Sequence, residues 1–125
     1  MATIKIKGQE YSMRMDVNAM EKIEEEFGDL KEALKAFRGR DRKISMVKSM
    51  FRILANSGKK YAGLPEDVTG EEINTCNLAD LNVLAEALNK TMDEAMHAET
   101  IGGNEADDSV HDEYMEELEQ QEKNG

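Results

Sequence analysis

The sequence predicts a mainly α-helical α+β fold, in which a compact helical bundle carries a small N-terminal β-hairpin and is followed by an acidic, flexible C-terminal tail. Three observations predict this. Apolar and polar residues alternate near the N-terminus, apolar residues then recur at helical intervals, and acidic residues crowd the end. We therefore expect a hairpin and bundle domain over residues 1–97 and a tail over residues 98–125.

The N-terminal segment has the alternation of a β-hairpin. In TIKIK (residues 3–7) and YSMRM (residues 11–15) apolar side chains occupy every second position, so each segment has one apolar face. Gly8 lies between the segments, where a tight turn can use its freedom to adopt a positive φ. Because two strands alone are marginally stable in water, we expect the apolar face to pack on the helices.

Two short amphipathic helices are predicted next, each introduced by capping-box spacing. In the first, Asn18 precedes Glu21 by three residues, and in the second Asp29 precedes Glu32 in the same way. Apolar residues follow on one stripe of each segment. The glycines expected to end the two helices are Gly28 and Gly39.

A third helix is predicted over about residues 43–57, ending at Gly58. Its polar residues form one narrow strip, so apolar side chains cover most of its circumference. Such a helix either lies at the centre of the core or keeps a face for a partner, and we favour the first because small helical domains need a central helix to pack around. The strip consists of Ser45, Lys48, Ser49, Arg52 and Asn56.

A loop rich in glycine follows, and then two further helix starts with capping spacing. Thr69 and Glu72 introduce a short helix that stops near Asn77, and Asn77 with Asp80 opens the longest helix, up to about His97. The apolar stripe of that longest helix consists of Leu78, Leu81, Ala85, Leu88, Met92 and Ala95, widened by Val83 and Met96.

The C-terminal tail concentrates the negative charge of the chain. Residues 98–125 hold ten acidic residues and one lysine, a net charge of −9 out of −11 for the whole chain. Within them, Val110, Tyr114 and Leu118 have helical spacing and predict at most a short, frayed amphipathic helix, because a helix of this length is marginal without packing. Tails of this composition act on partners or on solubility, so we expect a binding function.

Enzymes, metalloproteins and membrane proteins are not indicated. No segment approaches the roughly 18 apolar residues of a membrane span, and the N-terminus lacks the apolar run of a signal peptide, so we expect a cytoplasmic protein. The single cysteine, Cys76, fits a reducing compartment. His97 and His111 have no spacing typical of a zinc site or a catalytic triad. We expect no catalytic residue, metal or cofactor.

Residues 35–60 form a basic stretch with nine lysines and arginines and one aspartate, a net charge of +8. It is a solvated surface, a dock for the acidic tail or an acidic partner, or a phosphate-contacting patch, in that order of preference. Nucleic-acid binding is disfavoured because the chain is acidic overall and the aromatic residues nearby belong to core stripes. The candidate partner-binding residues are Arg38, Arg40, Arg42, Lys43, Met46, Met50, Tyr114 and Leu118.

The order of these segments resembles a known family. A hairpin ending in YSMRM, then AMEKIEEEFGDLKEAL, a basic loop, TGEEI, LADLNVLAEALNKTMDEAM and an acidic extension are similar to the small tail assembly chaperones of tailed bacteriophages and prophages, over about residues 2–97. The resemblance implies a helical, non-enzymatic protein of the host cytoplasm. Its partners would be the tape-measure protein, which it keeps soluble, and the tail-tube protein, which it helps to recruit.

The family also implies a second, longer product made by a programmed frameshift. Glu122, Lys123 and Asn124 can be encoded by a slippery run suited to a −1 shift, and the nucleotide sequence of the last ten codons tests this expectation. The alternative function is that of a small regulatory nucleic-acid-binding protein that uses residues 35–60.

Overall fold

The fold is mainly α-helical with a small N-terminal hairpin, as the sequence predicts. The computed structural model describes residues 2–39 and 42–97, so the predicted tail and its short helix lie outside the described residues. The elements are β1 (Ala2–Ile6), β2 (Gln9–Met13), α1 (Val17–Phe27), α2 (Leu30–Arg38), α3 (Ile44–Tyr61), the 3₁₀ helix η1 (Glu71–Ile73) and α4 (Leu78–His97).

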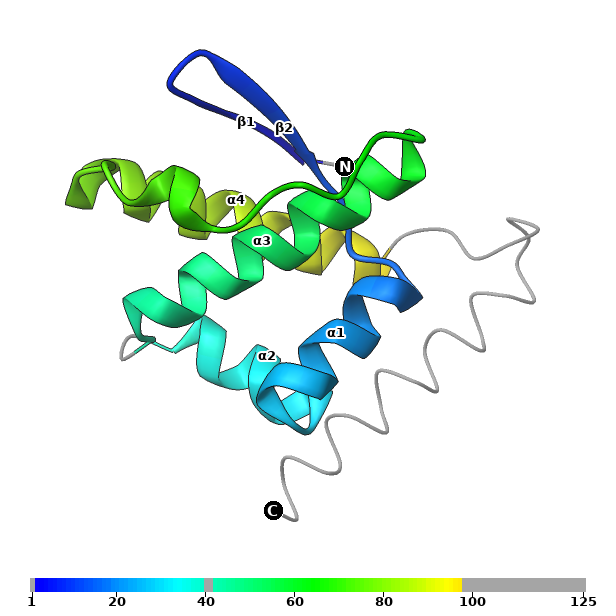
Figure 1. The fold of residues 1–125 in the computed structure, drawn as a ribbon. Coiled ribbons are helices and arrows are strands. Elements are labelled where there is room, and N and C mark those ends of the chain that lie inside the picture. The colour runs from blue at the N-terminus through cyan, green and yellow to red at the C-terminus, as the bar shows by residue number, and fades with distance from the viewer. Residues whose placement is uncertain (1, 40–41, 98–125) are drawn as a thin grey trace.

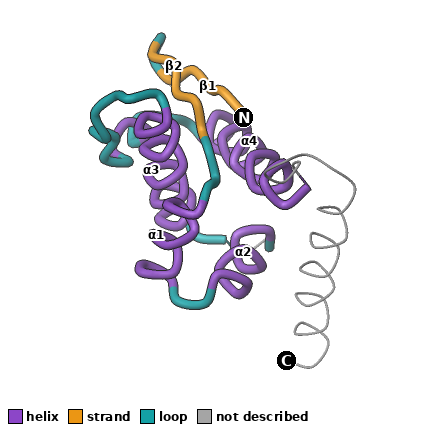
Figure 2. Tube along the Cα trace, turned by 90° about the vertical axis from the view of Figure 1, so that its right-hand side faces the viewer, coloured by secondary structure: helices purple, strands orange, loops and turns teal. Residues whose placement is uncertain are grey.

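Helix α3 lies at the centre of the described fold and packs against β2, α1 and α4 (Figure 1). The hairpin covers one side, where β2 packs on α3 and β1 packs on α4. Helices α1 and α2 pack against each other, at the end of the fold opposite the hairpin (Figure 1). In the view turned by 90° they lie below α4 (Figure 2). The expectation that the third helix is the core helix is confirmed.

The hairpin closes through a two-residue turn. Ile6 pairs with Gln9, so Lys7 and Gly8 form the turn, with φ angles of 52° and 79°. Two successive positive φ angles are typical of a type I′ turn, whose twist matches that of the strands. Because the turn is this short, the second strand begins at Gln9, two residues earlier than the alternation predicts.

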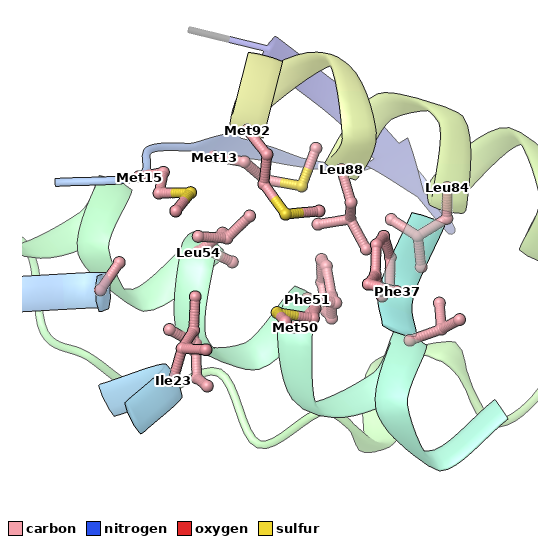
Figure 3. Close-up of a cluster of buried hydrophobic side chains, with 14 of the residues drawn as sticks. Met13, Met15, Ile23, Phe37, Met50, Phe51, Leu54, Leu84, Leu88 and Met92 are labelled. Carbon is pink, nitrogen blue, oxygen red and sulfur yellow. The ribbon is translucent and has the colours of Figure 1, made fainter. Parts of the chain in front are cut away.

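The buried core joins the hairpin to all four helices of the described residues (Figure 3). Its centre is rich in methionine, an unbranched side chain that fills irregular gaps well. Tyr11 of β2 meets Phe51 of α3 edge-on, with ring centroids 5.2 Å apart. The largest fully buried apolar side chains are Phe37, Phe51, Met13, Ile23, Met50, Leu54, Leu84, Leu88 and Met92.

Helix α3 does not end at Gly58, contrary to the sequence prediction, but continues to Tyr61. A Cβ atom at position 58 would lie 1.8 Å from the carbonyl oxygen of Ser12. Directly after β2, the backbone N–H of Arg14 donates a hydrogen bond of 3.0 Å to the carbonyl oxygen of Leu54 in α3. Glycine is therefore needed at position 58 for the close approach of β2, and it does not terminate the helix.

The helix caps confirm most of the predicted starts. Asp29 accepts a hydrogen bond of 3.0 Å from the N–H of Glu32, and Asn77 accepts one of 2.8 Å from the N–H of Asp80. The cap predicted for the first helix was wrong, because Asp16 takes that position through the N–H of Ala19.

Asn18, the predicted cap, lies one residue inside α1 instead. Its side-chain amide donates to the hydroxyl of the buried Ser57, at 3.2 Å. Aspartate and asparagine are both common N-caps, and here Asp16 accepts the capping hydrogen bond.

The loop between α3 and α4 is held against α3 by side-chain hydrogen bonds. Asn56 donates to the carbonyl oxygen of Val68 and accepts from its N–H, both at 2.9 Å. At the next corner, Glu72 accepts from the N–H groups of Thr69 at 3.1 Å and Gly70 at 2.7 Å. Burial opposes ionisation of Glu72, but these backbone hydrogen bonds hold its pKa below the ordinary value.

Candidate partner-binding groove

A groove of about 370 Å³, lined in nearly equal parts by polar and apolar atoms, lies between the N-terminal parts of α3 and α4. The two helices begin on the same side of the molecule (Figure 1). We call this surface the α3–α4 groove. It is lined by Arg42, Ile44, Val47, Leu78, Leu81, Asn82 and Ala85.

Two large apolar side chains of the groove are exposed to solvent. Ile44 is 65% exposed and Leu78 is 70% exposed, whereas Val47, one turn further along α3, is 2% exposed. Helical side chains lean toward the N-terminus, so the side chain of a first helical residue extends past the end of its helix. Ile44 and Leu78 are both first residues, and for that reason the core does not cover them.

The border of the groove at α3 is electropositive. Lys43 is the N-cap residue of α3 and makes no side-chain capping hydrogen bond, and the first turn contains no acidic residue. The positive end of the helix dipole is therefore left for another group to neutralise. Arg42 also lines the groove, and its guanidinium donates to the carbonyl oxygens of Phe37 and Gly39 at 3.4 Å each.

Two further recesses lie beside the hairpin. One, of about 290 Å³, includes Ile4, the half-buried Cys76 and the exposed Val83. The other, of about 360 Å³, includes Tyr11 and the ion pair of Lys59 with Asp67, whose atoms are 2.9 Å apart. Burial, and after it the charge of Glu72, raises the pKa of Tyr11, so its hydroxyl stays protonated.

The described residues do not assemble a recognisable chemical centre. Within residues 2–39 and 42–97, no three histidine, cysteine, aspartate or glutamate side chains come together as metal ligands would. None of the helices in that part of the chain has the length and apolar content needed to cross a membrane. The α3–α4 groove is suited to contact with another apolar surface.

The basic stretch joins elements of the fold. Arg38 forms an ion pair of 2.6 Å with Asp93 of α4. Arg52 forms an ion pair with Glu26 of α1, which also accepts a hydrogen bond of 2.9 Å from Ser49. Lys59 forms a third ion pair, with Asp67. Three bases of the stretch are therefore paired with acidic side chains, and the stretch does not form one continuous phosphate-binding face.

The candidate residues named from the sequence are separated by the fold. Arg42 lines the groove, and Lys43 is the N-cap residue of α3 next to it in the chain. Arg38 forms an ion pair with α4, and Met46 is half-buried. Met50 is fully buried, so in the folded domain it is a core residue with no surface to offer a partner. Arg40, Tyr114 and Leu118 lie outside the described residues.

Sequence reasoning missed Ile44 and Leu78, which it assigned to core stripes. The signal that could have identified them is their position, since each directly follows the N-cap of its helix. Comparisons of this chain with protein-family models, with curated proteins and with solved structures found no match.

Proposed function

We propose that this chain is an assembly chaperone of the tailed-bacteriophage type, which binds an apolar helical stretch of a tape-measure protein in the α3–α4 groove. The observation that carries the proposal is the pair of exposed apolar side chains, Ile44 and Leu78, which line the groove from its two helices. An amphipathic helix binds such a groove by placing its apolar face between the rims. The order of sequence segments described above supports the same role.

The proposed role is one of binding without catalysis, in the cytoplasm of the host cell. A tape-measure protein is a long helical chain with apolar stripes, and these associate unless they are covered. Binding in the groove would cover one stretch of it. The net charge of −11 would then keep the coated complexes apart by repulsion, until tail-tube subunits assemble around the tape measure.

The test is co-expression with a candidate tape-measure protein, followed by measurement of the soluble fraction. Wild-type chain is expected to keep the partner soluble, and the double variant Ile44→Ser/Leu78→Ser is expected to lose most of this effect. Val17→Ser is the matched control, because Val17 is 74% exposed but lies on α1 outside the groove. Equal solubilisation by wild type and the double variant would refute the groove as the binding site.

The nucleic-acid alternative predicts retention on DNA or RNA that falls steeply with salt. It has less support, because Arg38, Arg52 and Lys59 face acidic side chains of the body. Absence of retention at low salt would remove it.

A further inference from the structure

The α3–α4 groove combines two properties that a single ligand would have to match. Its rims are apolar, through Ile44 and Leu78, and its α3 border is positive, through Arg42, Lys43 and the uncapped helix start. A ligand that fits both is an amphipathic segment with one apolar stripe and acidic residues beside it.

The chain itself contains one segment of this chemistry. Val110, Tyr114 and Leu118 are spaced four residues apart, so in a helix they would form a single stripe. Residues 109–119 also include five acidic residues and neither lysine nor arginine. Their charge is opposite to that of the α3 border of the groove.

The connecting chain is long enough to bring this segment to the groove. Along α4, the distance from His97 back to Leu81 is about 24 Å at 1.5 Å per residue. Residues 98–109 can span up to about 40 Å when extended, and Gly102–Gly103 allows the chain to reverse direction. A tethered segment is also present at a local concentration of about 1 mM, so that even weak affinity gives substantial occupancy.

We propose that residues 110–118 occupy the α3–α4 groove of the same chain as an internal ligand that a partner must displace. Val110, Tyr114 and Leu118 would contact the apolar rims, while the neighbouring carboxylates would lie near Arg42, Lys43 and the first N–H groups of α3. Docking itself is independent of the proposed function. Only its regulatory consequence, competition with the helical partner, rests on that function.

Docking is tested by NMR on the full-length chain. The double variant Tyr114→Ser/Leu118→Ser keeps the net charge and removes most of the stripe. It is expected to shift the methyl signals of Ile44 and Leu78 and to leave those of Val17 unchanged. Met115→Ser is the matched control, because Met115 lies off the stripe and its loss should leave the groove signals in place.

A spin label on the tail identifies the occupant. In a Cys76→Ser background with a cysteine introduced at Gln120, the label is expected to broaden the signals of Ile44 and Leu78 within one chain. Mixing spin-labelled chains with isotope-labelled, unmodified chains should give no broadening. Broadening only in the mixture would assign the groove to the tail of a second copy and would overturn the proposal. Unchanged methyl signals of Ile44 and Leu78 in the double variant would also overturn it.

The regulatory consequence is measured separately, as the affinity for the helical partner. If the tail fills the groove for most of the time, the double variant should bind about two- to tenfold more tightly than wild type, since apparent affinity scales with the free fraction. Unchanged or weaker binding would refute competition. If the double variant shifts the groove methyl signals but the chain does not bind the partner, only the proposed function is refuted. If the chain binds the partner but the double variant leaves the groove methyl signals unchanged, only the docking is refuted.

Discussion

The two ends of α3 carry similar apolar side chains but are covered very differently. Toward the C-terminal end, Ile53, Leu54 and Ala55 are buried, and β2 approaches so closely that Gly58 has no room for a side chain. The last residue of the helix, Tyr61, is itself 62% exposed. At the N-terminal end, Ile44 is 65% exposed. We call these the closed end and the open end of α3.

The difference shows how a continuous apolar pattern is divided between folding and binding. The closed end is covered because the hairpin crosses it and a side-chain hydrogen bond holds the following loop beside it. The open end faces the N-terminal part of α4, whose own first residue, Leu78, is exposed. Substitutions at the closed end should therefore affect stability, and substitutions at the open end should affect binding.

The largest expected effect concerns Met50, which lies inward from the open end and is fully buried. Met50→Ala removes buried apolar volume and is expected to lower the free energy of unfolding by about 3 kcal/mol, measured by urea denaturation. The control is Met46→Ala, one turn closer to the open end and half-buried, with an expected loss of less than about 1 kcal/mol. Equal losses would mean that the open end is as closely packed as the core.

The second prediction concerns Gly58 at the closed end. Gly58→Ala should destabilise the protein by about 2 kcal/mol, because a Cβ atom would overlap the Ser12 carbonyl and force the backbones apart. In an exposed helix the same change is usually stabilising, so the sign is diagnostic. Thermal unfolding is compared with that of Ser45→Ala, an exposed site on the same helix, for which little change is expected. A stabilised Gly58→Ala variant would contradict the close approach.

The third prediction concerns the pH dependence of the corner that follows the closed end. Because the pKa of Glu72 is lowered in the folded state, its ionised form stabilises the fold above the ordinary value of 4.5, and this contribution is lost as the pH falls through the folded pKa. Glu72→Gln should cost about 1 kcal/mol near neutral pH. The difference from wild type should shrink in acid.

Urea denaturation at about pH 7 and about pH 3 measures this difference. Glu71→Gln is the control, since Glu71 is an exposed neighbour in η1 and should change stability by less than about 0.5 kcal/mol at either pH. A Glu72→Gln deficit that stays constant with pH would show that ionisation of Glu72 plays no part.

The smallest expected effect on stability lies at the open end. Ile44→Ser and Leu78→Ser should each change the free energy of unfolding by less than about 0.5 kcal/mol, because both side chains are largely exposed. Measured by urea denaturation beside the solubility assay, this result would separate a binding defect from a folding defect. A loss as large as that of Met50→Ala would place both side chains in the core instead.

Much of the fold was predictable because the signals are local. Strict alternation predicted the hairpin, and caps such as Asp29 and Asn77 predicted helix starts through contacts three residues apart. Local signals failed where another segment intervened. Gly58 resembles a helix stop in the sequence, but in the structure β2 lies directly against it. Asn56 resembles a solvated residue, but its side chain pairs with the backbone of Val68.

The candidate site was less predictable than the fold. The basic stretch drew attention to Arg38 and Arg42, but their roles depend on Asp93 and on backbone carbonyls that the sequence does not place beside them. Ile44 and Leu78 match the periodicity of the core stripes, and the local feature that sets them apart is their position directly after an N-cap.

The sequence by itself determined the kinds of element, their order and the side of each helix that is apolar, because periodicity and capping depend on neighbours within one turn. Only the tertiary structure decided which apolar side chains are covered. Coverage depends on where a distant segment lies, and here the hairpin reaches the closed end of α3 while the start of α4 leaves Ile44 and Leu78 exposed at the open end.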